Sequence, residues 1–169
     1  MNSKSVLEKL FREALDRVRV ERVFAERARL EDDGRPCHVV ALGKAARPMA
    51  RAFTRATGRR PASGLLVVPH GDEGAPVEGF DELSGGHPLP DSGSFAAADV
   101  IVDRLRPLDE RDRAVFLLSG GGSALVEKPL WPHLGLEAWK EMYRALVGCG
   151  LGIVEVNALR KHLSAVKGG

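Results

Sequence analysis

Three short, almost unbroken apolar runs constrain the fold of this chain more than any other feature of its sequence. They are CHVVALG (37–43), GLLVVP (64–69) and AVFLL (114–118), with a candidate fourth strand at 80–83. Runs without polar alternation are expected where both faces of a parallel sheet are covered. Segments with helical periodicity separate them, so the sequence predicts an α/β sandwich in which right-handed crossovers join the strands of a parallel sheet.

The segments between these runs carry apolar residues at three- and four-residue spacing, which is typical of helices with one buried face. The expected helices are an amphipathic helix over 6–18, a second piece over 24–30, a helix from near Lys44 that Gly58 and Pro61 close, a helix capped by Asp91, Ser92 or Ser94 that Pro107 stops, and helices over 136–147 and 153–163. The segment 31–36 is a turn by composition.

The composition narrows the class of partner. The 169 residues contain 25 basic and 23 acidic side chains, and a net charge of +2 gives no electrostatic reason to expect nucleic acid or an anionic membrane. No apolar run approaches the roughly 20 residues that span a bilayer, and the amino end is not a signal peptide, so we expect a cytoplasmic protein. Cys37 and Cys149 belong to no CxxC motif or Cys/His cluster, and both are expected to be buried.

In a parallel sheet, the loops that follow the strands meet at one rim, where α/β proteins bind their ligands. The predicted strands are followed by Gly43-Lys44, Pro69-His70-Gly71, Gly85-Gly86-His87 and the segment 119–123. We therefore expect these four segments to lie together and to contain the ligand site.

The segment LSGGGSAL (118–125) places Ser119, Gly120, Gly121, Gly122 and Ser123 directly after a buried strand. Glycine tolerates positive φ and has no Cβ, so successive N–H groups can turn toward one oxyanion, and the serines add hydroxyl donors. The segment is not a Walker A motif, lacks the GxGxxG spacing of a dinucleotide site, and fails the GxSxG pattern because a leucine replaces the second glycine. The sequence predicts anion binding here; the alternative is a flexible turn without a ligand.

Three further candidate residues follow the predicted strands. Lys44 opens a helix, where the helix dipole disfavours a cation unless a bound anion compensates. Lys44 therefore either binds a phosphate or carboxylate group of a ligand, or it is a solvated surface lysine. His87 is a candidate donor to a ligand oxygen, the alternative being a histidine bonded to the backbone of its own loop. Asp91 is a helix cap or, alternatively, a metal ligand.

The carboxyl end, NALRKHLSAVKGG, is basic and has helical spacing. It contains Asn157, Arg160, Lys161, Ser164 and Lys167, of which Asn157, Lys161 and Ser164 lie close to one helix face. Such a run is either a solvated face or one wall of the anion site.

Taken together, GKAARPMA, GLLVVPHG, GGHPLPDSGS, LSGGGSALVEKP and NALRKHLSAVKGG resemble, in order and spacing, the amino-terminal domain of the glycerate 2-kinase family. Some members of that family carry the older label hydroxypyruvate reductase. The resemblance runs from about Leu7 to Gly169. It implies transfer of the γ-phosphoryl group of ATP to the 2-hydroxyl of D-glycerate, with a divalent cation such as Mg²⁺. The reaction would take place in a cleft between a Rossmann-like domain and a smaller carboxy-terminal domain called MOFRL.

The resemblance also implies roles for the candidate residues. Lys44 would be the catalytic residue at the reacting centre, and the segment 119–123 would bind phosphate groups or the glycerate carboxylate. His87 and Asp91 match the HPxPD loop of the family, and the basic run matches a motif beside the cleft. The metal ligands remain unassigned.

Relative to that family, residues 1–169 are expected to form only the amino-terminal Rossmann-like domain, a three-layer sandwich whose mostly parallel sheet is incomplete at its carboxyl end. The MOFRL domain would be missing, so we expect little kinase activity from the chain alone. The expected partners are ATP, D-glycerate, and either the missing carboxy-terminal half or a second copy of the chain.

Two alternatives stay open at this point. One is a non-catalytic or partner-dependent phosphate-binding module. The other is a nucleotide-dependent oxidoreductase of the hydroxypyruvate reductase type, against which the absence of GxGxxG and of a downstream acid placed for a ribose argues.

Overall fold

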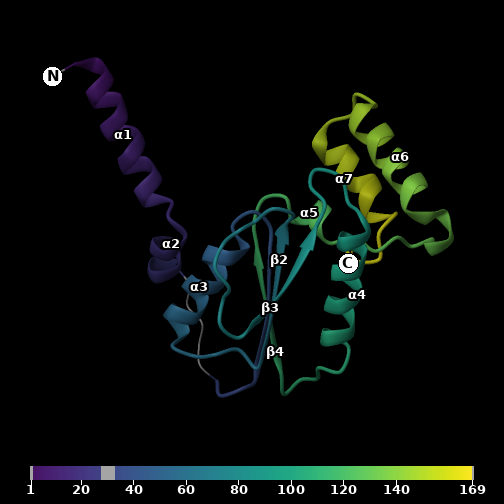
Figure 1. The fold of residues 1–169 in the computed structure, drawn as a ribbon, viewed down its shortest axis with the longest axis horizontal. Coiled ribbons are helices and arrows are strands. Elements are labelled where there is room, and N and C mark those ends of the chain that lie inside the picture. Colours follow the sequence, from purple (N-terminus) through teal and green to yellow (C-terminus); the bar gives the residue numbers. More distant parts are fainter. Residues whose placement is uncertain (1, 28–32, 169) are drawn as a thin grey trace.

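The predicted strands form one parallel sheet (Figure 1). The computed structural model describes residues 2–27 and 33–168. The strands are β1 (Cys37–Leu42), β2 (Ser63–Pro69), β3 (Phe80–Gly85) and β4 (Arg113–Leu118), in the order β3-β2-β1-β4. In register, Val40 of β1 lies beside Leu65 of β2 and Phe116 of β4. The predicted α/β fold with a parallel sheet is confirmed.

Helices cover both faces of the sheet, which gives three layers (Figure 1). They are α1 (Ser3–Arg17), α2 (Val20–Arg27), α3 (Ala46–Thr57), α4 (Ser92–Leu105), α5 (Gly122–Leu125), the 3₁₀ turn η1 (Pro132–Leu134), α6 (Gly135–Gly148) and α7 (Ile153–Lys161). The helix predicted over 24–30 corresponds to α2 as far as Arg27. Its remaining residues, like the start of the turn predicted over 31–36, lie outside the described part of the chain.

The core consists of two clusters, one on each face of the sheet. The first packs α3 against the strands and contains Val39, Ala41, Ala46, Ala50, Phe53, Leu66, Val68, Val77 and Leu117. The second packs α4 and α5 against the opposite face and contains Val40, Leu65, Val67, Ala97, Ile101 and Leu125. Successive strand residues point to opposite faces, and both faces are covered, which explains why β1 and β2 lack polar alternation.

β4 differs from β1 and β2 because only one of its faces is buried. Leu117 is 6% exposed, whereas Phe116 and Leu118 are 49% and 63% exposed. β4 also lies at the edge of the sheet and pairs with β1 alone. The apolar run predicts the strand correctly, but the described residues cover only half of it.

α1 extends away from the sheet (Figure 1) and has no buried residue. The amphipathic pattern therefore predicts the helix correctly, but its apolar stripe, which includes Leu7 and Phe11, is exposed. Within residues 2–27 and 33–168, no helix is long and apolar enough to cross a bilayer.

Two residues are placed differently from what their type suggests. Cys149, expected to be buried, is exposed because it follows the last turn of α6 at the surface, whereas Cys37 is partly buried. Arg47 on the inner side of α3 is only 4% exposed. Its guanidinium donates to Asp72 (2.9 Å) and to both carboxylate oxygens of Glu82 (2.8 and 2.9 Å). Because a buried charge is stable only when paired, these bonds hold the start of α3 against the neighbouring strand and loop.

Candidate functional site

The carboxyl ends of the four parallel strands lie at one rim of the sheet. β1 is followed by Lys44, β2 by His70, β3 by His87, and β4 by residues 119–123, which we call the glycine loop. The segments that the sequence places after the strands therefore belong to one region of the structure.

The glycine loop is fastened to the turn between β1 and α3. The hydroxyl of Ser119 donates to the Leu42 carbonyl (3.1 Å) and accepts from the Ala45 N–H (3.0 Å). The Lys44 N–H donates to the Gly120 carbonyl (2.9 Å). The Ser119 hydroxyl is thus committed to holding two segments together, which leaves other groups of the loop to meet a ligand.

The middle of the glycine loop presents backbone donors. The N–H groups of Gly120, Gly121 and Ser123 form no hydrogen bond with any described residue. Gly121 has φ +88°, and a Cβ there would lie 2.8 Å from Cδ2 of His87 and 3.6 Å from Cγ of Lys44. Only glycine fits this position, and its missing Cβ lets both side chains approach the loop. Adjacent unpaired N–H groups of this kind are typical of an anion site.

Two cavities adjoin the glycine loop. One has a volume of about 170 Å³ and is lined in part by His87, Gly121, Ser123, Tyr143 and Arg160. The other has a volume of about 550 Å³ and is lined in part by Phe116, Leu118, Ser119, Ser123, Asn157, Arg160, Lys161 and Lys167. Ser123 and Arg160 belong to the walls of both cavities, so a ligand in either cavity would lie near both residues.

Asp91 is the N-cap of α4. Its Oδ1 accepts from the N–H groups of Ser94 and Gly86 (3.0 Å each), and its Oδ2 lies 2.6 Å from Nε2 of His70. Burial raises the pKa of the Asp91 carboxyl, but the hydrogen bonds from Ser94, His70 and Gly86 outweigh this effect and lower the pKa. Both oxygens of this carboxylate already have partners within the protein.

Two residues of the basic run contact the region of the glycine loop. Nη2 of Arg160 donates to the hydroxyl oxygen (2.6 Å) and to the carbonyl (3.2 Å) of Ser123. Nζ of Lys167 donates to the Val126 carbonyl (3.2 Å) and pairs with the fully buried Glu127.

The other residues of the run have different surroundings. Asn157 and Lys161 are exposed on α7, and the amide oxygen of Asn157 accepts from Nη1 of Arg160 (3.2 Å). Ser164 is buried, and its backbone forms an isolated bridge with Pro129. Arg160 is therefore the residue that joins this run to the glycine loop directly.

No individual role for His70, Glu127 or Tyr143 is predicted from the sequence. The position of His70 directly after a predicted strand was a usable signal. Glu127 follows an apolar stretch, and an acidic residue there indicates a buried partner. Tyr143 gives no such signal, because a tyrosine on the inner face of a helix is an ordinary core residue.

A metal site is not evident in the described part of the chain, where no group of three or more His, Cys, Asp or Glu side chains could hold an ion. Mg²⁺ usually takes one or two carboxylates together with substrate phosphates. Asp91 is the carboxylate at this rim that the sequence suggests, and its oxygens are committed to His70, Gly86 and Ser94. The described residues therefore do not fit a dedicated cation site.

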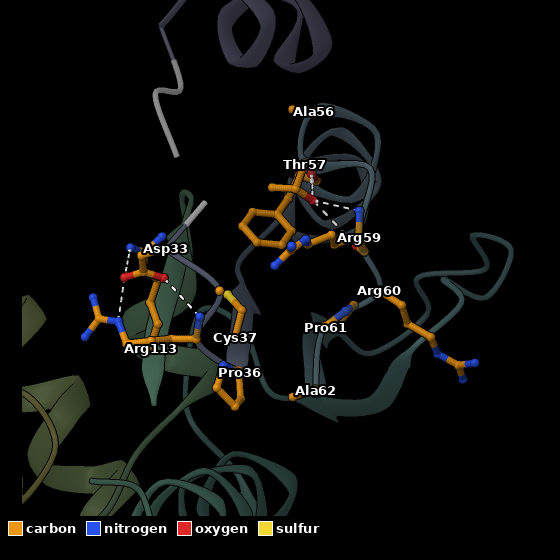
Figure 2. A pocket seen from close by; sticks show the side chains of 13 residues that line it. Asp33, Pro36, Cys37, Ala56, Thr57, Arg59, Arg60, Pro61, Ala62 and Arg113 are labelled. Atoms are coloured by element: carbon orange, nitrogen blue, oxygen red, sulfur yellow. Dashed lines mark hydrogen bonds and ion pairs between the residues drawn. The ribbon is translucent and has the colours of Figure 1, made fainter. Parts of the chain in front are cut away.

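A further cavity of about 360 Å³ lies beside the first residues of β1 and β4, at the opposite end of the sheet (Figure 2). Its wall includes Cys37, Arg35, Arg59, Arg60 and Arg113. Asp33 pairs with both Arg35 and Arg113 at 2.5 Å. Burial raises the pKa of the Cys37 thiol, so this cysteine is not an activated nucleophile.

The family described as "Domain of unknown function (DUF4147)" matches residues 6–169. The chain belongs to this family. Two curated relatives of the DUF4147 chain are the D-glycerate 2-kinase of Thermotoga maritima and the glycerate 2-kinase of Pyrococcus horikoshii. The first is 40% identical over 131 residues (78% of this chain, 31% of the relative), and the second is 35% identical over 161 residues (94% and 36%). A third relative, from Agrobacterium vitis, is 38% identical over 133 residues (79% and 30%) and carries the hydroxypyruvate reductase label.

The DUF4147 chain also resembles a solved structure. The crystal structure of the T. maritima glycerate kinase superposes with a TM-score of 0.84 at 32% identity, covering 96% of this chain and 39% of that one. The resemblance to the glycerate 2-kinase family and the α/β fold are thereby confirmed. The chain spans about a third of the length of the curated relatives it matches.

Proposed function

We propose that this DUF4147 chain is the amino-terminal part of an ATP-dependent kinase that phosphorylates the 2-hydroxyl of D-glycerate. The observation that carries the proposal is the group of N–H donors at Gly120, Gly121 and Ser123, which lacks partners among the described residues and lies beside Lys44 and His87. The names of the T. maritima and P. horikoshii relatives support the choice of substrate.

The chemistry requires little beyond this set of groups. In the proposed reaction, the 2-hydroxyl oxygen of glycerate bonds to the γ-phosphorus while the bond to the departing ADP oxygen breaks, and the hydroxyl proton is released to solvent. Such transfers depend on positioning and on stabilising the charge of the phosphoryl oxygens. The N–H groups of the glycine loop would donate to phosphate or glycerate carboxylate oxygens, Lys44 would offset the charge of the transferred group, and His87 would add a donor.

A divalent cation, with Mg²⁺ as the expected metal, would neutralise phosphate charge when bound. Because the described residues do not fit a dedicated cation site, the proposal gives them no metal-binding role. Asp91 is assigned to the support of the loop after β3, where it caps α4 and pairs with His70.

We further propose that residues 1–169 act as the amino-terminal Rossmann-like domain of the kinase and that a carboxy-terminal part completes the active site. The chain spans about a third of the length of its curated relatives, so it is expected to turn over slowly or not at all by itself. Its other proposed partner is a second copy of the chain, through the exposed face of β4. As part of this proposal, we expect a cytoplasmic location and no nucleic-acid or membrane partner.

The test measures ADP release with ATP and D-glycerate, first for the chain alone. The measurement is then repeated after adding a second polypeptide, the part of the T. maritima D-glycerate 2-kinase that this chain does not match. D-glycerate-dependent ADP release is expected only in the mixture. It should be lost in Lys44→Ala and retained in the control Lys9→Ala, whose lysine pairs with Glu13 on the exposed helix α1. ATP binding without any D-glycerate-dependent ADP release would instead favour a non-catalytic phosphate-binding module.

The hydroxypyruvate reductase label of the A. vitis relative defines a second candidate. It is tested by direct NADH oxidation with hydroxypyruvate, without coupling enzymes. The proposal expects no oxidation by the chain or by the mixture, and hydroxypyruvate-dependent oxidation would replace the kinase with an oxidoreductase.

A further inference from the structure

A series of buried polar side chains leads from the interior toward the glycine loop. It begins at Glu127, which is fully buried two residues after the end of α5. Oε2 of Glu127 accepts from the Tyr143 hydroxyl (2.6 Å) and pairs with Lys167, while Oε1 accepts from the Lys128 N–H (3.0 Å). A buried carboxylate is strongly destabilising without such partners. The positions of Tyr143 and Lys167 are therefore coupled to Glu127.

Tyr143 extends this series from α6 to α7. Its buried hydroxyl accepts from Nε (2.9 Å) and from Nη2 (2.6 Å) of Arg160. The guanidinium carbon of Arg160 lies 4.6 Å from the centroid of the Tyr143 ring, which is a cation–π arrangement. Burial raises the pKa of Tyr143, so the hydroxyl stays protonated and donates a hydrogen bond to Glu127.

Arg160 connects the series to the glycine loop. An arginine has five N–H donors, and the bonds to Tyr143, Asn157 and Ser123 occupy most of them. Arg160 is thus poorly placed to enclose an anion with a free guanidinium fork. The hydroxyl oxygen of Ser123 accepts from Arg160, and its own hydrogen is donated to no described residue. That hydrogen is available for a ligand.

We propose that Glu127 and Tyr143 are positioning residues: they hold Arg160 against the glycine loop so that the Ser123 hydroxyl donates to a ligand phosphate oxygen together with the loop N–H groups. The inference rests on the proposed function, because it takes a phosphate group as the ligand. Arg160 then orients Ser123 and supplies positive charge nearby, while Lys167 balances the charge of Glu127.

A purely structural role for this series, in which it only holds α6 against α7, predicts a different result. If the series only held α6 and α7 together, its loss would lower the free energy of unfolding and leave ATP affinity unchanged. If the series positions Ser123, its loss also weakens the hydrogen bond from the Ser123 hydroxyl to the ligand. The two roles separate in a double-mutant cycle, because residues that act through one another have non-additive effects.

The experiment uses the full chain and titrates it with ATP in the presence of EDTA, by calorimetry. Tyr143→Phe keeps the ring and removes the hydroxyl, Glu127→Gln keeps the shape and removes the charge, and Ser123→Ala removes the proposed donor. Each is expected to weaken ATP binding about 10- to 100-fold, the size of one lost hydrogen bond to a charged group. The Tyr143→Phe and Ser123→Ala losses should not add in the double variant. The matched control is Lys128→Met, which removes an exposed ion pair with Asp99 and should bind like the wild type.

A second readout follows the Nε–H resonance of Arg160 in ¹⁵N spectra. It should shift in Tyr143→Phe and Glu127→Gln and remain in place in Lys128→Met, and thermal unfolding identifies any variant that fails to fold. Wild-type affinity in folded Tyr143→Phe and Glu127→Gln chains, or additive losses in the double variant, would overturn this inference while leaving the proposed function intact. A wild-type chain that binds no ATP would overturn the inference, while the proposed function would still be tested by D-glycerate-dependent ADP release in the mixture.

Discussion

The two ends of the sheet differ in how their polar groups are satisfied. At the carboxyl end, the glycine loop presents N–H groups without partners in the described structure, next to the exposed side chain of Lys44. At the amino end, the cavity in Figure 2 is lined by several arginines, of which Arg35 and Arg113 pair with Asp33. The positive side chains at the amino end are thus partly neutralised by the protein itself. Unpaired donors indicate the ligand site better than a count of charges does.

Lys44→Ala is expected to produce the largest difference between the two ends. In a kinase completed by a carboxy-terminal part, turnover should fall about 100-fold or more, because charge stabilisation at the reacting centre contributes effects of that size. The unfolding temperature should not change, since Lys44 is exposed. Arg60→Ala at the amino end, which removes an exposed side chain 3.7 Å from Glu78, should keep its activity. Both are measured by ADP release, and full activity in Lys44→Ala would remove Lys44 from the mechanism.

Gly121→Ala and Gly58→Ala compare two glycines with similar backbones. Their φ angles are +88° and +64°, but a Cβ would meet His87 at 2.8 Å only at position 121 and nothing within 4 Å at position 58. Each substitution should cost about 1 kcal/mol of stability through backbone strain. Only Gly121→Ala should also weaken ATP binding, by about tenfold. Equal affinities in the two variants would show that the close approach of His87 has no part in binding.

Lys167, at the carboxyl end, should make the free energy of unfolding depend on pH in the alkaline range. Burial lowers the pKa of Lys167 from 10.5 to about 8. Below about pH 8 the ammonium is protonated in both states, and the penalty for burying it is fully present. Between about pH 8 and about pH 10.5 the unfolded chain binds more protons than the folded one, so the free energy of unfolding rises with pH.

This rise should amount to at most about 3–4 kcal/mol and should be absent in Lys167→Met. Denaturant unfolding of both chains across that pH range provides the measurement. Parallel curves for the two chains would mean that the Lys167 ammonium is not buried in solution.

Asp33, at the amino end, should have a smaller effect on the free energy of unfolding, and this effect should appear in the acidic range. Burial raises the pKa of Asp33, but hydrogen bonds from Arg35 and the charge of Arg113 outweigh this effect and lower it. The stabilisation is present above the ordinary carboxyl pKa of 3.8 and is lost as the pH falls through the lowered value of the folded state. Asp33→Asn should therefore unfold at a slightly lower temperature than the wild type near neutral pH and at the same temperature in strong acid. Its ATP affinity should be unchanged, and a loss of affinity would mean that the amino end also contributes to the site.

The fold could be predicted from the sequence because its central strands are local features. β1 and β2 are apolar runs bounded by glycine, proline or polar residues, and their covered faces follow from the missing alternation. The covering of β4 could not be predicted, because it depends on which helices reach its outer face. For the same reason, the exposure of α1 could not be predicted, because its apolar stripe predicts a helix but does not say which element covers that stripe.

The candidate site also contains features that could be predicted from the sequence and features that could not. The glycine loop and Lys44 could be found because glycine runs and strand ends are visible in the sequence. The sequence could not show that the Ser119 hydroxyl is committed to Leu42 and Ala45 while that of Ser123 keeps its donor. It also could not show the connection between Glu127, Tyr143 and Arg160, since α6 and α7 bring together side chains that are 16 and 17 residues apart.

The Asp91 carboxylate has a consequence for hydrogen exchange. One of its oxygens, Oδ1, accepts both the Gly86 amide, directly after β3, and the Ser94 amide, in the first turn of α4. The Gly86 amide also donates to the Ser94 hydroxyl (3.0 Å), so a motion that withdraws Oδ1 and moves Ser94 with it exposes both amide protons at once. The loop after β3 and the start of α4 should therefore open as one cooperative unit of local unfolding, with the two amides exchanging at matched rates.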